Sequence, residues 1–170
     1  ARVVGAGVGE GEEWRNVEVT AYFTYSGNVT SKSHGISIGS RSNHNDYDDN
    51  PCNAHGYYLK YWAASREIGV QKEFYHNGSN VIYSGSRRGK TLVDFVPGSF
   101  IGVKFVIRDA YDGVQLDVYA DYTEGRDGGD WNLITSFKDT NWKAVGYDDD
   151  YDFPCRYTYF KNPYNKASST

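Results

Sequence analysis

The sequence predicts an all-β protein in which two antiparallel sheets pack face to face, as in a concanavalin-like jelly-roll sandwich. Three observations lead to this prediction. The 170 residues include 16 Tyr and 8 Phe, and aromatic side chains suit the half-buried face of a pleated sheet. Apolar and polar residues alternate with a period of two along most of the chain, and no segment has the helical period. Turn sequences rich in Gly, Asn and Asp separate the alternating segments.

Each expected strand has one apolar face. In the first, Val17, Val19 and Phe23 alternate with Glu18 and Thr20, so that the apolar side chains face the core. The same alternation indicates strands at residues 16–25, 34–41, 56–62, 67–76, 99–109 and 113–122, with later strands at 131–139 and 156–160. Turns are expected at 76–80, 84–90, 96–99, 108–113 and 123–130. Because the sequence contains no internal repeat and no linker, residues 1–170 are expected to form a single jelly-roll domain.

Charge and hydropathy exclude several partners. The formal net charge of −4 does not favour nucleic acid or an anionic membrane, and no stretch approaches 18 apolar residues. The sequence lacks H-E-x-x-H, C-x-x-C, G-x-S-x-G and P-loop patterns, so no zinc site and no organic cofactor are expected. The chain starts at Ala1 without Met or a signal peptide, which fits either a processed terminus or the edge of a fragment. Glycosylation sequons at Asn28 and Asn77 favour an extracellular or cell-surface location.

The two cysteines follow similar acidic segments. Cys52 ends the sequence NHNDYDDNPC, and Cys155 ends the sequence GYDDDYDFPC. We expect them to form a disulfide bond, with free buried thiols as the alternative. A bridge closing a loop of about 100 residues would constrain the unfolded chain by roughly 4–5 kcal/mol in the entropy model.

This disulfide bond would bring two acidic loops together. Crowded carboxylates repel one another unless a cation or solvent relieves them, and Ca²⁺ prefers six to eight oxygen ligands. Ca²⁺ is therefore the candidate cofactor, and two solvated acidic loops are the alternative. The candidate ligands are Asp46, Asp48, Asp49, Asp148, Asp149, Asp150 and Asp152.

Strand alternation also predicts a polar outer face. With Leu59 facing the core, Tyr58, Lys60 and Trp62 face away from it, and Arg41 lies opposite Ile38. With Val70 facing the core, Gln71, Glu73 and Tyr75 face away, whereas Lys72 and His76 share the parity of Val70. A simple solvated face is the alternative reading. The same rule exposes Lys104, Arg108, Gln115, Asp117, Tyr119 and Asp121.

Several segments resemble a known family. They are WRNVEVTAYF from Trp14, SIGSRSNH with Arg41 and His44 before Cys52, GYYLKYW, VQKEFYH and GSFIGVKFVIRD. In this order they are similar to secreted microbial polysaccharide-lyase-like proteins with a concanavalin-like jelly roll. The resemblance runs from about Trp14 to Asp121 and implies this fold and a polysaccharide substrate. The E-x-D-x-x-E strand of jelly-roll glucanases is absent, as are the Arg-rich, Q-I-H and Y-K-G-Y strands of alginate lyases.

The outer face supplies the groups that an acidic polysaccharide would need. A lyase must neutralise a uronate carboxylate, remove the neighbouring proton and protonate the leaving oxygen. Arg41 and Gln71 would neutralise the uronate carboxylate. His44 or His76 would be the base that removes the proton, and Tyr58 would be the acid that protonates the leaving oxygen. Lys60, Trp62, Glu73 and Tyr75 would complete the substrate-binding face. The alternatives are a non-catalytic glycan-binding module and a self-assembling subunit of a surface layer or filament.

The disulfide prediction can be checked by mass. Denatured, unreduced protein should take up no alkylating reagent, and reduction should expose both thiols of the 2 cysteines. Two alkyl groups added without reduction would show free thiols and remove the bridge.

Overall fold

The computed structural model describes residues 16–26, 28–31, 34–41, 56–77, 80–83 and 88–139. Apart from the short 3₁₀ turn η3 (Arg126–Gly128), all of the regular structure here is strand. The strands are β1 (Val17–Phe23), β2 (Gly35–Ser40), β3 (Gly56–Trp62), β4 (Glu67–Asn77), β5 (Asn80–Tyr83), β6 (Arg88–Leu92), β7 (Ile101–Ala110), β8 (Gly113–Asp121) and β9 (Trp131–Asp139).

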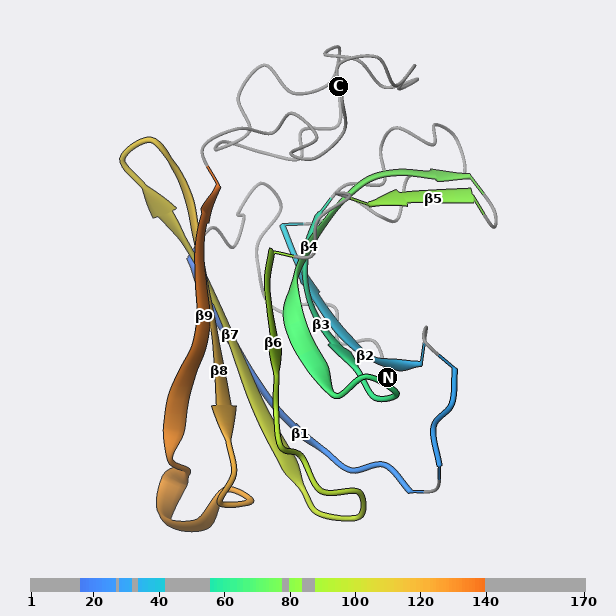
Figure 1. Ribbon diagram of the computed structural model, residues 1–170. Helices are drawn as coiled ribbons and strands as arrows, with labels where there is room; N and C mark the ends of the chain where they lie inside the picture. The colour runs from blue at the N-terminus through green and yellow to red at the C-terminus, as the bar shows by residue number, and fades with distance from the viewer. Residues whose placement is uncertain are drawn as a thin grey trace, which may run out of the picture.

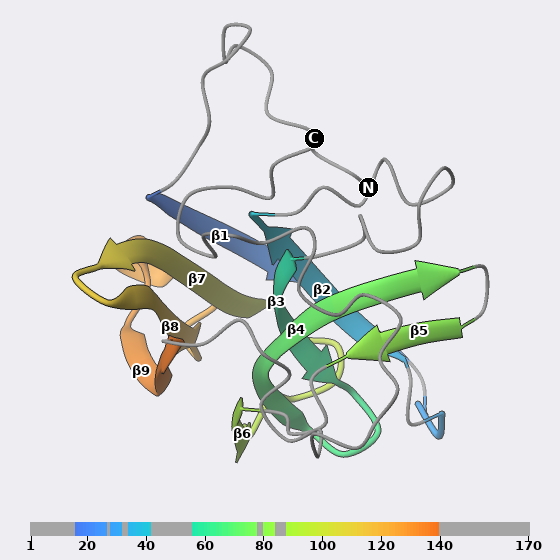
Figure 2. The same ribbon diagram turned by 90° about the horizontal axis from the view of Figure 1, so that it is seen from above.

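The strands form two sheets. The four-stranded sheet has the order β1-β7-β8-β9, and the five-stranded sheet has the order β2-β3-β4-β5, with β6 also paired to β4 (Figure 1). The strand pairs are antiparallel, as expected for strands joined by short turns. Seen from above, β7, β8 and β9 form a layer beside β3 and β4 (Figure 2). For the part of the chain that the structure describes, the prediction of an all-β fold with two antiparallel sheets is therefore confirmed.

One hydrophobic core lies between the sheets. Leu59 and Val70 contribute to it from the five-stranded sheet, and Phe105 and Leu116 from the four-stranded sheet. All four side chains are no more than 1% exposed. Full burial of one such side chain stabilises the fold by roughly 1.5–3 kcal/mol, so the core holds the two sheets together.

Seven of the expected strands correspond to observed strands, namely β1, β2, β3, β4, β7, β8 and β9. Strands β5 and β6 are not among the expected strands; the turns expected at 76–80 and 84–90 overlap them at Asn80 and at Arg88–Lys90. The first three residues of β6, Arg88–Lys90, were therefore wrongly assigned to a turn. Their strand conformation depends on pairing with β4, where Arg88 lies across from Val70, and such pairing is a long-range interaction. The expected strand at 156–160 lies outside the described residues.

A polar contact joins the sheets inside this apolar interior. Lys72 of β4 has the same parity as Val70 and points inward, where its Nζ atom lies 2.6 Å from Oδ2 of Asp139 on β9. The Tyr57 hydroxyl group donates a 2.6 Å hydrogen bond to the same oxygen. Lys72 thus follows strand alternation, and a charged partner from the other sheet allows its burial.

Asp121 fixes the loop that connects β8 to β9. Its carboxylate accepts hydrogen bonds from the Thr123 amide (2.8 Å) and hydroxyl (2.6 Å), the Gly125 amide (2.7 Å), the Asp130 amide (3.0 Å) and the Tyr22 hydroxyl (3.0 Å). Burial acts to raise the pKa of Asp121, but these hydrogen bonds outweigh it and hold the pKa well below that of an ordinary aspartate. The loop therefore folds around one negative charge.

Replacing Asp121 with Asn should destabilise the protein by about 2–4 kcal/mol at neutral pH. The side-chain NH₂ group of Asn would replace a carboxylate oxygen and would face N–H and O–H donors that it cannot accept from. The folded pKa lies below the unfolded value of about 3.9, so the stabilisation is present above that pH and is lost as the pH falls toward the folded pKa. The difference between wild type and Asp121→Asn, measured by urea unfolding across a pH series, should therefore shrink in acid.

Asp127→Asn is the matched control, because Asp127 is exposed in the same loop. A difference for Asp121→Asn that is small at neutral pH, or that grows in acid, would contradict the proposed role of the carboxylate.

Candidate functional site

The face of the five-stranded sheet that points away from the core brings Tyr58 and Gln71 together. These residues lie directly across from each other on β3 and β4, and Gly39 of β2 lies on the other side of Tyr58. Directly opposed residues in an antiparallel sheet project their side chains to the same face. The next row along the strands contains Ser37, Lys60 and Gly69 in the same relation.

A glycine makes room for the tyrosine ring on this face. The Tyr58 ring lies over Gly39, where an added Cβ atom would be only 2.7 Å from Cε1 of the ring. The Lys60 Nζ atom lies 5.9 Å from the centroid of the same ring. Tyr58, Lys60 and Gln71 are all partly exposed. An aromatic ring, a cation and an amide therefore lie next to one another and are accessible to a ligand.

The sheet is curved at this place. In Figure 1, β4 arcs along its length, and its concave side faces away from the four-stranded sheet. Tyr58 and Lys60 belong to this concave side, because the intervening Leu59 is in the core. We call the partly exposed group Tyr58, Lys60 and Gln71 the concave patch.

Two expected members of this face are not exposed. Trp62 and Glu73 have the parity of Tyr58 and Gln71, but they are 6% and 1% exposed. The expectation that both are accessible is therefore wrong. Alternation assigns a side chain to a face, whereas its exposure depends on what packs over that face. The concave patch lies between these two buried residues.

Arg41 lies away from the concave patch. It follows β2 with a left-handed φ of 51°, and its Nη2 atom lies 2.8 Å from Oδ1 of Asp109, at the end of β7. The guanidinium group is thus committed to an ion pair with the other sheet. Gln71 and Lys60 are better placed to meet a ligand carboxylate.

The backbone of β4 changes register near Tyr75 and His76. Glu73 pairs with Tyr83 and Tyr75 with Ile82, so β4 has one extra residue at this point. A bulge interrupts the alternation of side chains along a strand. Alternation from Glu73 therefore does not assign Tyr75 to a face of the sheet.

Other candidate residues lie in parts of the chain that the structure does not describe. These are His44, Cys52 and Cys155, together with the seven Asp residues considered for Ca²⁺. Within the described ranges there is no group of three or more His, Cys, Asp or Glu residues that could hold a metal ion. Also within them, no helix is long and apolar enough to cross a membrane.

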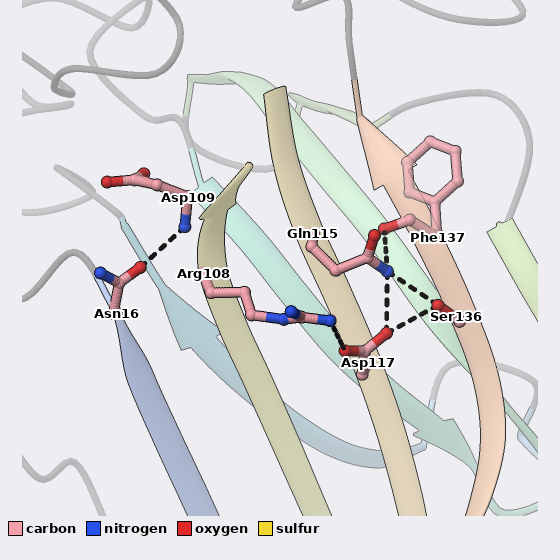
Figure 3. Close-up of polar contacts among 7 residues, drawn as sticks. All are labelled: Asn16, Arg108, Asp109, Gln115, Asp117, Ser136 and Phe137. Atoms are coloured by element: carbon pink, nitrogen blue, oxygen red, sulfur yellow. Dashed lines mark hydrogen bonds and ion pairs between the residues drawn. The ribbon is translucent and has the colours of Figure 1, made fainter. Parts of the chain in front are cut away.

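The outer face of the four-stranded sheet carries a polar network instead (Figure 3). The Asp117 carboxylate accepts hydrogen bonds from Ser136 (2.6 Å), Gln115 (2.8 Å) and Arg108 (3.1 Å). Burial acts to raise the pKa of Asp117, but these three donors outweigh it and lower the pKa. Asp117 and Asp121 were expected to be exposed, but they are 6% and 0% exposed. Because its acceptor sites are occupied within the sheet, Asp117 is a poor candidate for a base.

The same sheet carries an aromatic group that sequence reasoning missed. Tyr22 of β1 and Trp131 of β9 have ring centroids 5.8 Å apart, and Lys104 Nζ lies 4.5 Å from the Trp131 ring. These rings meet over Gly102, where β1, β7, β8 and β9 lie side by side. Only the register of four strands brings Tyr22 and Trp131 together, so no local sequence signal marks this group. We take the concave patch as the candidate site because it places an amide, Gln71, beside an aromatic ring and a cation.

Gly39→Val should move the Tyr58 ring, because an added Cβ atom would come within 2.7 Å of Cε1. Overpacking of this kind should cost about 1–2 kcal/mol of stability and change the near-ultraviolet circular dichroism of tyrosine. Ser37→Val, one row along β2, is the control, because Ser37 lies across from Lys60 and not from Tyr58. Equal stability and equal spectra for the two variants would show that Gly39 does not position Tyr58.

Comparisons with known protein families, curated proteins and solved structures give no match. The functional conclusion therefore rests on the residues and geometry of the concave patch.

Proposed function

We propose that this chain is a secreted carbohydrate-binding jelly roll that holds an acidic, uronate-containing polysaccharide against its concave patch. The observation that carries the proposal is the adjacent placement of Tyr58, Lys60 and Gln71 on the concave face. An aromatic ring, a cation and an amide are the groups with which a protein recognises a sugar ring, its carboxylate and its hydroxyl groups.

Each group has a distinct role in this proposal. The Tyr58 ring packs against the apolar face of a sugar, and its hydroxyl group can exchange a hydrogen bond with a neighbouring hydroxyl. The Gln71 amide donates to the uronate carboxylate, and Lys60 adds a positive charge beside it. Gly39, directly across from Tyr58, gives the ring room to lie over β2.

Electrostatics limit the strength of binding. The chain has a net charge of −4, which repels a polyanion at long range, so attraction must come from the local charge of Lys60. A single partly exposed cation contributes little and is screened by salt. Binding should therefore depend on several sugar rings at once and should weaken as ionic strength rises.

The concave patch also contains part of the chemistry of β-elimination. Gln71 and Lys60 can neutralise the carboxylate of the substrate, and Tyr58 can protonate the leaving oxygen. His44 or His76 is the proposed base. The patch alone is sufficient for binding, whereas cleavage requires this further residue.

Tyr58→Ala and Gln71→Ala should each weaken binding to an acidic polysaccharide about tenfold, the equivalent of about 1.4 kcal/mol. The measurement is isothermal titration calorimetry on alginate and pectate oligosaccharides, chosen because both consist of uronates. Tyr119→Ala is the matched control, because Tyr119 is partly exposed on the opposite, four-stranded sheet.

If Tyr119→Ala lowers affinity and Tyr58→Ala does not, the ligand binds the other sheet and the concave patch is not the site. Cleavage is decided separately, by the absorbance of unsaturated uronate products. Product formed by wild type and lost in His44→Ala or His76→Ala, with binding retained, would identify a lyase. Binding without product would identify a non-catalytic module.

A further inference from the structure

Lys72, Asp139 and Tyr57 form a buried cluster that the proposed function does not use. The Lys72 and Asp139 side chains are 3% and 2% exposed, and their Nζ and Oδ2 atoms are 2.6 Å apart. The Arg66–Asp94 ion pair is different, since its side chains are 57% and 89% exposed. The Lys72–Asp139 contact also joins strands of different sheets.

Burial makes the charged form of such a pair costly. Removing an ammonium and a carboxylate from water carries a large free-energy cost, which their attraction repays only in part. Val70, two residues before Lys72, and Val114, directly across from Asp139, are 1% and 0% exposed. In this setting, a neutral product made from the same atoms would be favoured over the ion pair.

We infer that Lys72 and Asp139 form an intramolecular isopeptide bond, an amide between the lysine amine and the aspartate carboxyl group. A proton first passes from the ammonium to the carboxylate, which leaves a neutral amine beside a neutral acid. The nitrogen lone pair then attacks Cγ of Asp139, and the new C–N bond gives a tetrahedral intermediate. A proton moves from nitrogen to the departing oxygen, the C–O bond breaks and water leaves. The ammonium and carboxylate thus become one amide and one water, with no change in oxidation state.

Tyr57 is placed to assist this reaction. Its hydroxyl group donates a 2.6 Å hydrogen bond to Oδ2 of Asp139, which polarises the carboxyl group toward attack. The fold also holds the amine and the carboxyl group in contact, which is equivalent to a very high local concentration of one beside the other. Exclusion of water from the interior also disfavours hydrolysis of the amide once it has formed.

The bond would tie β4 to β9 and thereby the five-stranded sheet to the four-stranded sheet. Every strand from β5 to β8 would lie within the covalent loop. Such a loop restricts the unfolded chain as a disulfide bond does, but it does not respond to reductant.

The test is the intact mass of the reduced, denatured wild-type protein, followed by proteolysis and peptide sequencing by mass spectrometry. The expected mass is lower than the sequence mass by one water molecule, and a branched peptide should join the segments that contain Lys72 and Asp139. Lys72→Met should have its full sequence mass. Asp139→Asn should form the same amide with loss of ammonia instead of water.

Lys138→Met is the control, because Lys138 is adjacent to Asp139 but pairs at the surface with Asp112. This variant should keep the loss of water. A wild-type protein of full sequence mass would overturn the inference. So would a loss of water that persists in Lys72→Met, because cyclisation at an Asp–Gly step such as Asp112–Gly113 gives the same change. The wild-type branched peptide decides the question even if Lys72→Met does not fold.

Discussion

The structure depends on burying one face of each sheet in a common core. Phe105 and Leu116 from one sheet and Leu59 and Tyr61 from the other are no more than 1% exposed, and they belong to one cluster. Because side chains alternate along a strand, this burial assigns every second residue to an outer face. The arrangement of polar groups on both outer faces is a consequence of that single constraint.

Two of the polar groups that are nevertheless buried meet partners from distant strands. Asp121 is surrounded by amide and hydroxyl donors of its own loop and of β1, and Lys72 meets Asp139 across the interior. Buried polar groups are tolerated only when hydrogen bonds replace water. These contacts fix the β8–β9 loop and the relative position of the two sheets more specifically than apolar packing alone would do.

The two outer faces differ in the polar groups that they present at the surface. On the four-stranded sheet, Asp117 is bonded by Arg108, Gln115 and Ser136, and Lys104 covers Trp131. On the concave face, Tyr58 and Gln71 are partly exposed beside glycines. The first face holds a carboxylate inside a hydrogen-bonded network, and the second places a ring and an amide side by side at the surface. This adjacency is the physical reason for proposing the concave patch as the binding site.

The sequence by itself determined the all-β class, seven of the strands and the inward residues of six of them, because all of these follow from period-two alternation. It also placed Tyr58, Lys60 and Gln71 on one face. Tertiary structure decided which of these residues are accessible: Trp62 and Glu73 have the same parity but are buried. It also decided that Arg41 pairs with Asp109 and that β6 pairs with β4. The contacts of Lys72 with Asp139 and of Tyr22 with Trp131 likewise arise only in the folded protein. Each of these outcomes depends on residues far apart in the chain, and a local pattern carries no information about such contacts.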